Sequence, residues 1–265
     1  MSTHISTQPA SPALLSHDRR LAVGVFFLAL AVYTLTYVGA FKSNDERALF
    51  SGVDSFVKRG QFTVNQIYWD YTNVGMVTAD GEMAPNYEPG QMALAIPFYL
   101  WGRALGAAVQ GVMFFNVLVT AATVALVYLC FVELRFGRRT AALGAFVYAF
   151  ATLAWPYSRT FFREPLTALA YVLAVYALLR YRPPGPRRLR WPALAGLALG
   201  LALVTKQISV AAAPSLLLLA YAYERGRPAD AGSSLRRQRL TVALAALLPL
   251  ALALGGERVY HAATL

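Results

Sequence analysis

The sequence contains few charged residues, and few of these are acidic. Asp, Glu, Lys and Arg make up 14% of its 265 residues, whereas soluble domains usually carry about a quarter. Hydrophobic residues make up 57% and gather in runs of roughly 20, the length that a helix needs to cross a bilayer. This composition excludes an ordinary soluble domain and predicts an integral membrane protein.

Cysteine and histidine are also scarce. A single cysteine, Cys130, excludes an intrachain disulfide and a cysteine-based metal site. The three histidines, at positions 4, 17 and 261, are too scattered to predict a metal cluster. The sequence has no Walker loop, no dinucleotide fingerprint and no HExxH motif. We therefore predict no metal-ligand residues and no certain cofactor, and leave a divalent metal open.

The excess of positive charge, +11 in formal net charge, is not accompanied by stacking aromatic residues. A basic chain is also typical of nucleic-acid binding, but here the arginines form short clusters between apolar runs. The positive-inside rule explains such clusters as cytoplasmic ends of membrane helices. We therefore expect a lipid bilayer as partner and no nucleic acid.

Seven apolar runs predict transmembrane helices. Residues 1–20 are expected to be a flexible cytoplasmic tail, 21–260 a membrane module, and 261–265 the truncated end of that module. Residues 38–40 resemble a signal-peptidase site, but the apolar run before them is longer than a signal peptide needs, which favours a retained anchor. The predicted spans are residues 21–41, 112–132, 140–155, 165–179, 191–204, 208–223 and 240–255.

An eighth apolar run, residues 91–107, is interrupted by Pro97, Gly102 and Arg103, and we interpret it as an interfacial helix. If it does not span, the arginine clusters all lie on the cytoplasmic side and nearly all acids lie on the other side. If it did span, the later arginine clusters would lie on the extracytoplasmic side, against the positive-inside rule. The predicted fold is therefore all-α, with about seven transmembrane helices and a large extracytoplasmic first loop, residues 42–111, that carries amphipathic juxtamembrane helices.

The start of this loop carries two candidate catalytic acids, Asp45 and Glu46. Ser43 and Glu46 fit a capping box that opens an amphipathic helix, which Gly60 is placed to end. Asp45 lies at the positive end of the helix dipole, which favours an ionised carboxylate that accepts a proton from a hydroxyl. An acid in a first helical turn is commonplace, so capping and catalysis both remain open for this pair.

The predicted topology brings further charged residues to the same outer face. Glu164 precedes Pro165, so it either caps a helix or acts as a second catalytic acid. Arg159 and Arg163 either hold a phosphate or extend among lipid headgroups, and Lys206 falls on the same face. Cations and acids that meet at a membrane surface suit a reaction between a lipid phosphate and a hydroxyl.

These residues resemble the protein O-mannosyltransferase and lipid A aminoarabinose transferase branch of the GT-C glycosyltransferases. The likeness covers about residues 21–260, and the ordered set of segments is more specific than any one of them. Four segments carry it: Asn44-Asp45-Glu46, Asn86-Tyr87-Glu88-Pro89-Gly90 leading into 94–99, Tyr157-Ser158-Arg159 with Arg163-Glu164-Pro165, and 200–206, which ends in Thr205-Lys206.

The resemblance implies an inverting transferase that uses a polyprenyl-phosphate-linked sugar and a hydroxyl acceptor on the extracytoplasmic face of the cytoplasmic membrane. Asp45 would be the general base, and Glu164 a second acid that orients the acceptor or the sugar. The cations Arg159, Arg163 and Lys206 would stabilise the leaving phosphate. Tyr87 and Glu88 would belong to the donor-binding site.

Two departures from the family pattern leave a second interpretation open. Relatives often carry a lysine where this chain has Asn86 and then Glu88, and they continue with further spans beyond the point that corresponds to Leu265. We therefore expect either a fragment or a module completed by a partner membrane subunit. The alternative is a non-catalytic, GT-C-derived structural subunit of a membrane complex. A transporter or channel is disfavoured because the spans contain almost no ionisable residues.

Overall fold

The computed structural model describes residues 12–65, 75–78, 81–182, 188–225, 243–244, 247–248 and 251–256, and these are mostly helical. The predicted all-α class is thus confirmed for the described residues, apart from one short hairpin. The helices are α1 Pro12–Leu35, α2 Asn44–Arg59, α3 Gly90–Ala104, α4 Ala108–Glu133, α5 Arg138–Phe150, α6 Ala154–Ser158, α7 Glu164–Tyr181, α8 Arg190–Thr205, the 3₁₀ helix η2 Gln207–Ala212 and α9 Ala213–Arg225.

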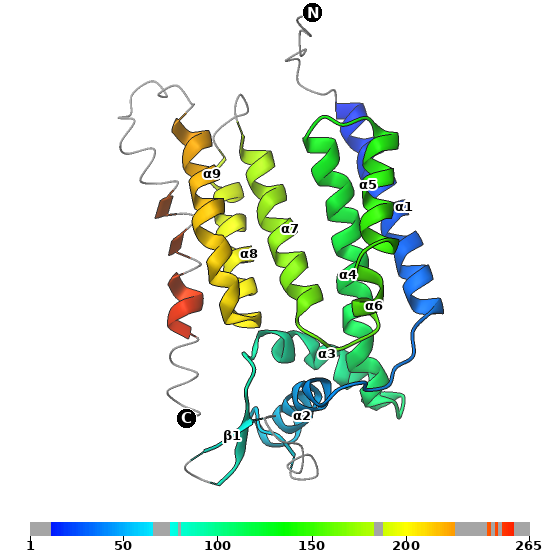
Figure 1. Ribbon diagram of the computed structural model, residues 1–265, viewed down its shortest axis with the longest axis vertical. Helices are drawn as coiled ribbons and strands as arrows, with labels where there is room; N and C mark the ends of the chain where they lie inside the picture. The colour runs from blue at the N-terminus through cyan, green and yellow to red at the C-terminus, as the bar shows by residue number, and fades with distance from the viewer. Residues whose placement is uncertain are drawn as a thin grey trace, which may run out of the picture.

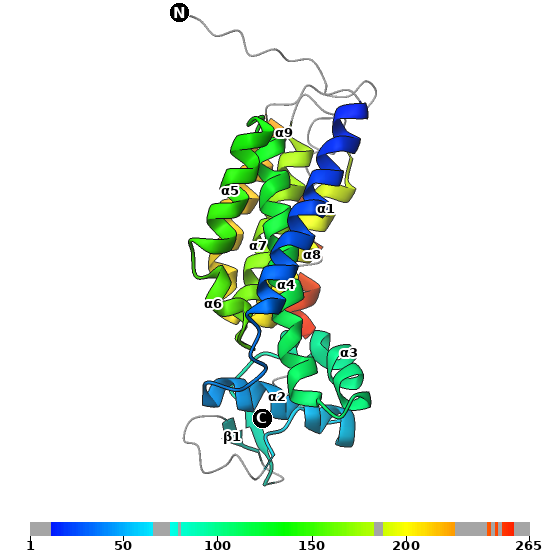
Figure 2. The ribbon, with the colours of Figure 1, turned by 90° about the vertical axis from the view of Figure 1, so that its right-hand side faces the viewer.

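The long helices lie side by side in a bundle, and the other elements gather at one end of it. In Figures 1 and 2, α1, α4, α5, α7, α8 and α9 run along the long axis, while α2, α3 and the hairpin lie together beneath them. At the opposite end, Arg138 Nε lies 2.5 Å from Asp18 Oδ1 and Arg180 Nη1 lies 2.7 Å from Glu133 Oε1. Arginines therefore mark one end of the bundle, as the charge pattern predicted.

Six of the seven predicted spans overlap helices, although α1 ends at Leu35, before the predicted end of the first span, and the span 208–223 begins within η2. Of the seventh, 240–255, residues 240–242, 245–246 and 249–250 lie outside the described residues, and the remainder is helical. Residues 261–265 also lie outside them, and α1 begins at Pro12, within the predicted tail. Among the described residues, α4 is the one helix both long and apolar enough to cross a membrane, and α8 is apolar but shorter. The seven-span topology therefore stays a prediction.

The predicted helix 140–155 is broken in the structure. Helix α5 ends at Phe150, and the short α6 begins at Ala154. The side chain of Thr152 accounts for the break, because its hydroxyl donates to the Tyr148 carbonyl at 2.7 Å and accepts from the Ala154 N–H at 3.1 Å. Such local bonds compete with the helical ladder. The chain therefore turns early and leads into the segment 159–163.

The capping box and the amphipathic helix at the start of the large loop are confirmed. Ser43 is the N-cap of α2, and Gly60 ends the helix with a φ of 77°, a left-handed conformation that glycine adopts without strain. The apolar face of α2 is buried against α3: Leu49 and Val53 share a core with Met92. Burial of this face fixes the orientation of the helix that carries Asp45.

The run 91–107, predicted as an interfacial helix, corresponds to α3, which lies with α2 at the end of the bundle (Figure 1). It starts against the end of α8: a Cβ added at Gly90 would lie 2.5 Å from the Val204 carbonyl oxygen. Between α2 and α3, β1 (Gly75–Val77) pairs antiparallel with β2 (Met83–Pro85), with Gly75 opposite Pro85. This hairpin was not predicted.

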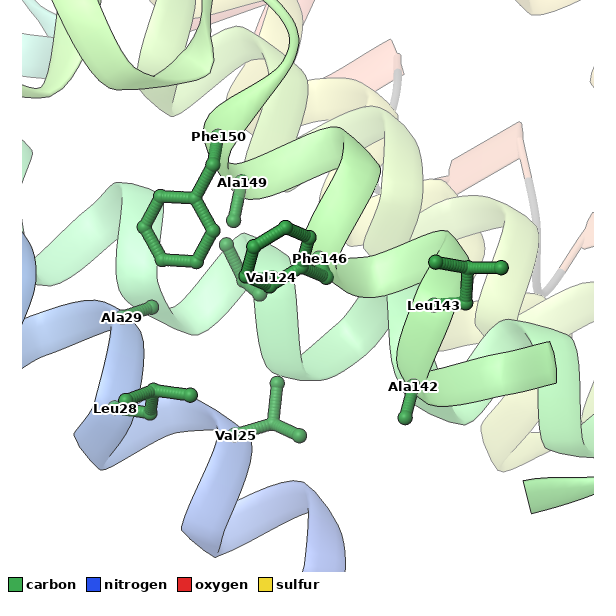
Figure 3. A pocket seen from close by; sticks show the side chains of 9 residues that line it. All are labelled: Val25, Leu28, Ala29, Val124, Ala142, Leu143, Phe146, Ala149 and Phe150. Atoms are coloured by element: carbon green, nitrogen blue, oxygen red, sulfur yellow. The ribbon is translucent and has the colours of Figure 1, made fainter. Parts of the chain in front are cut away.

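An apolar pocket of about 380 Å³ opens on the side of the bundle between α1, α4 and α5. Figure 3 shows its aliphatic and aromatic lining, and none of the predicted site residues belongs to it. Its lining offers hydrocarbon contacts but almost no polar groups, so it does not suit a sugar or a phosphate. The predicted acids Asp45 and Glu46 lie instead on α2, at the end of the bundle that α2 and α3 occupy.

Candidate functional site

Asp45 lies in the first turn of α2 with an exposed side chain. Its carboxylate is hydrogen-bonded to the side chain of Tyr87, which follows the hairpin. The pKa of Tyr87 lies well above its usual value, chiefly because the ring is partly buried and further because of this hydrogen bond to Asp45. The phenol therefore stays protonated and donates to Asp45, which remains open to a second partner.

Glu46, the neighbouring acid, is fully buried. Its Oε2 accepts from the backbone N–H groups of Lys42 and Ser43 at 2.5 and 3.0 Å, and its Oε1 accepts from the N–H of Phe161 at 2.9 Å. The capping interpretation is confirmed. The prediction also placed Glu46 among the catalytic acids, but both of its oxygens already accept from backbone N–H groups. We assign it a positioning role for this reason.

Two further buried side chains hold the segment around Phe161, and neither was predicted. Gln91 Nε2 of α3 donates to the Phe161 carbonyl at 2.7 Å. Asn116 Nδ2 of α4 donates to the carbonyls of Thr160 and Phe162 at 2.8 and 2.7 Å. The only signal in the sequence is an amide within an otherwise apolar helix, which does not reveal a partner 44 or 70 positions away.

Arg163, at the end of this segment, contacts three groups. Its Nη1 pairs with Glu88 Oε2 and donates to the Thr205 carbonyl at 3.3 Å, and its guanidinium lies 4.7 Å from the centre of the Tyr87 ring. Burial lowers the pKa of Arg163, an effect that nearby negative charges, including those of Glu164 and Asp45, oppose. Tyr87 thus connects the exposed acid to Arg163.

A second ion pair lies beside the first. Lys206 Nζ is 2.7 Å from Glu164 Oε1, and about a third of the lysine side chain is exposed. The two pairs are joined through the end of α8, because Glu88 Oε1 also accepts from the Gln207 N–H at 2.5 Å. Predicted residues from four separate parts of the sequence are therefore brought together.

Arg159 differs from the other two cations. Within the part of the chain that the structure describes, its Nε atom is buried and has no hydrogen-bond partner. Among the described residues it takes part in neither ion pair, although Asn116 binds the backbone of the short segment between it and Arg163. Its guanidinium retains hydrogen-bonding capacity for a ligand.

Comparison with known proteins decides the family. Residues 101–255, more than half of the chain, match the family model described as dolichyl-phosphate-mannose-protein mannosyltransferase. The chain belongs to this family. The match confirms the GT-C resemblance and supports a glycosyltransferase. Neither a search of curated proteins nor a search of solved structures gave a match.

The matched part of this mannosyltransferase-family chain includes one half of the site. Arg159, Arg163, Glu164 and Lys206 fall inside residues 101–255, whereas Asp45, Tyr87 and Glu88 precede them. The contacts from Asp45 to Tyr87 and from Tyr87 to Arg163 join the two halves. The geometry therefore joins residues of the matched region to residues that precede it.

Among the described residues, no group of three or more His, Cys, Asp or Glu side chains is arranged to hold a metal ion. Glu88 and Glu164 face cations instead, and Glu46 faces backbone N–H groups. These side chains are arranged around positive charge supplied by the protein itself.

Proposed function

We propose that this chain transfers a sugar from a polyprenyl-phosphate-linked donor to a hydroxyl acceptor at the extracytoplasmic face of the cytoplasmic membrane. The family match supports the donor class. The observation that carries the proposal is the location of an exposed acid, Asp45, at the same end of the bundle as Arg163 and Lys206. Tyr87 contacts both Asp45 and Arg163.

The proposal includes a membrane topology of about seven spans with a cytoplasmic N-terminus. Helix α4, at 26 residues and about 1.5 Å each, is about 39 Å long, enough for a bilayer core of about 30 Å. The remaining long helices lie beside it, and arginine pairs lie at the end opposite α2 and α3. This arrangement supports an extracytoplasmic site at the membrane boundary.

In the proposed reaction, the Asp45 carboxylate takes the proton of the acceptor hydroxyl. The acceptor oxygen attacks the anomeric carbon of the sugar from the side opposite the phosphate, forming the new glycosidic bond as the bond to the phosphate oxygen breaks. The electron pair of that bond leaves with the polyprenyl phosphate, and the configuration inverts. A phosphate needs little protonation to leave, so one base with suitable cations is chemically sufficient.

The same proposal gives the cations their role. Arg163 and Lys206 are each paired with a carboxylate in the free protein, from Glu88 and Glu164. We expect the donor phosphate to replace one carboxylate oxygen on each cation, and Arg159 to supply hydrogen bonds that it does not make here. Glu164, once released from Lys206, would be free to orient the acceptor or the sugar.

The alternative, a non-catalytic structural subunit of a membrane complex, draws on one observation. Two of the three cations already have protein partners, so their pairing alone is also consistent with a structural role. A structural subunit has no need for an exposed carboxylate held by Tyr87, and Asp45 therefore discriminates the two functions.

The test is sugar transfer from a polyprenyl-phosphate donor in membranes that contain the chain. We expect Asp45→Asn to lower the rate by about 10²- to 10⁴-fold, the usual contribution of a general base, while the protein stays folded and inserted. The matched control is Glu82→Gln, which removes an acid whose nearest ion-pair partner is Arg59 at 3.8 Å. Wild-type turnover by Asp45→Asn contradicts the assignment of the base, and no turnover by the wild type favours the structural subunit.

A further inference from the structure

Three buried polar side chains from three helices form hydrogen bonds with the backbone of residues 160–162. Glu46 of α2 accepts from the Phe161 N–H, Gln91 of α3 binds the Phe161 carbonyl, and Asn116 of α4 binds the carbonyls on either side. All three side chains belong to fully buried residues. Four backbone groups of three consecutive residues are thus fixed by elements that are far apart in the sequence.

Two of these side chains, Gln91 and Asn116, lower the stability of the fold, so packing alone does not explain their presence. The amide oxygens of Gln91 and Asn116 are buried and have no hydrogen-bond partner among the described residues. An unsatisfied buried acceptor is unfavourable, and an apolar side chain of the same size would avoid it. Both amides act only as donors, and both donate to the same short segment. Their shared target indicates a role in fixing that segment.

The segment lies between the two arginines of the site. Arg159 precedes it and Arg163 follows it, and Arg163 reaches Glu88 and the end of α8. Glu46 also binds the N–H groups of Lys42 and Ser43, which lead into α2 and Asp45. One carboxylate therefore connects the start of the helix that bears the acid with the segment that bears the arginines.

We propose that Glu46, Gln91 and Asn116 are positioning residues that hold the arginine-bearing segment at a fixed distance from Asp45. The inference rests on the proposed function for its catalytic meaning. A displacement of about 1 Å between reacting groups costs about 100-fold in rate, so a fixed spacing between base and phosphate-binding cations is what such a transfer requires. The hydrogen bonds to residues 160–162 do not depend on which sugar or acceptor is used.

The variants that test it keep side-chain volume and remove the donors: Gln91→Met and Asn116→Leu in the full chain. The matched control is Thr123→Val, because Thr123 is fully buried on α4 like Asn116 but donates within its own helix, to the Val119 carbonyl at 2.9 Å. The first measurement is hydrogen exchange of a peptide that covers residues 157–163, in detergent or nanodiscs. It does not depend on activity.

We expect exchange at the Phe161 amide to become about 10- to 100-fold faster in both amide variants and to stay unchanged in Thr123→Val. Where the wild type transfers sugar, we also expect the KM for the polyprenyl-phosphate donor to rise about tenfold, equivalent to the loss of about one such hydrogen bond. A smaller folded fraction lowers the maximal rate but leaves KM unchanged. The KM therefore separates positioning from misfolding.

Wild-type exchange in both amide variants overturns the inference. So does faster exchange with an unchanged donor KM, because the segment would then move without consequence for the donor. A wild type that transfers no sugar contradicts the proposed function, and the exchange measurement still decides whether the two amide side chains hold the segment.

Discussion

Asp54 is the carboxylate that ties α2 to α3. It is buried, and it accepts from Tyr99 of α3 at 2.6 Å, from Lys58 at 3.0 Å and from Asn65 at 3.0 Å. Burial raises the pKa of such a carboxyl, but the three hydrogen bonds outweigh it, and the pKa of Asp54 lies below its ordinary value of 3.8. Its charged form is therefore bound more strongly in the folded protein than in the unfolded chain.

The direction of this shift predicts the pH dependence of stability. Because the pKa is lower in the folded state, the stabilisation is present above pH 3.8 and is lost as the pH falls through the folded value. We expect Tyr99→Phe to lower the free energy of unfolding by about 1 to 3 kcal/mol at neutral pH, and this difference to shrink below about pH 4. Thermal or denaturant unfolding at pH 7 and pH 3 measures it. An equal difference at both pH values contradicts the role of the charged form.

At the scale of elements, the close approach of α3 to α8 places Glu88 beside Arg163. Gly90 opens α3, and a Cβ there would lie 2.5 Å from the Val204 carbonyl oxygen and 2.7 Å from its carbon. Backbone atoms move away less easily than a side chain does. A methyl group at this position therefore has to separate the two helices.

We expect Gly90→Ala to destabilise the protein by about 1 to 3 kcal/mol and to weaken the pairing of Glu88 with Arg163. Gly24→Ala is the control, since a Cβ at Gly24 in α1 meets nothing within 4 Å; it should leave stability unchanged or raise it by up to about 1 kcal/mol. Thermal unfolding in detergent compares the two. If the two variants are equally stable, α8 moves away from α3 at no cost in free energy.

Local sequence signals predicted the elements well and their long-range contacts poorly. The apolar runs located the long helices, and Ser43, Glu46 and Gly60 located the ends of α2, because each signal acts within a few residues. The break between α5 and α6 depends on one threonine hydroxyl, and the hairpin lies in a polar stretch without clear alternation. Gln91 and Asn116 were missed because their partners are set by the packing of three helices.

At the scale of the whole molecule, the two ends of the bundle are expected to face opposite sides of the membrane. In a Cys130→Ala background, Lys42→Cys and Arg139→Cys introduce exposed thiols at these two ends. We expect a membrane-impermeant maleimide added to intact cells to label position 42 at least tenfold faster than position 139, which becomes reactive once the membrane is permeabilised. Equal labelling in intact cells would contradict the proposed topology.

The pairing of Arg163 and Lys206 with carboxylates has a consequence for how a donor arrives. Arg163 is matched by Glu88 and Lys206 by Glu164, and the two charges outside these pairs, Arg159 and Asp45, are of opposite sign, so the free site projects little long-range field. Electrostatic steering accelerates encounters only where such a field exists, and it weakens as ionic strength rises. A donor that diffuses laterally within the membrane needs no such attraction. Its capture by this chain should therefore depend on its surface density in the bilayer and hardly at all on salt.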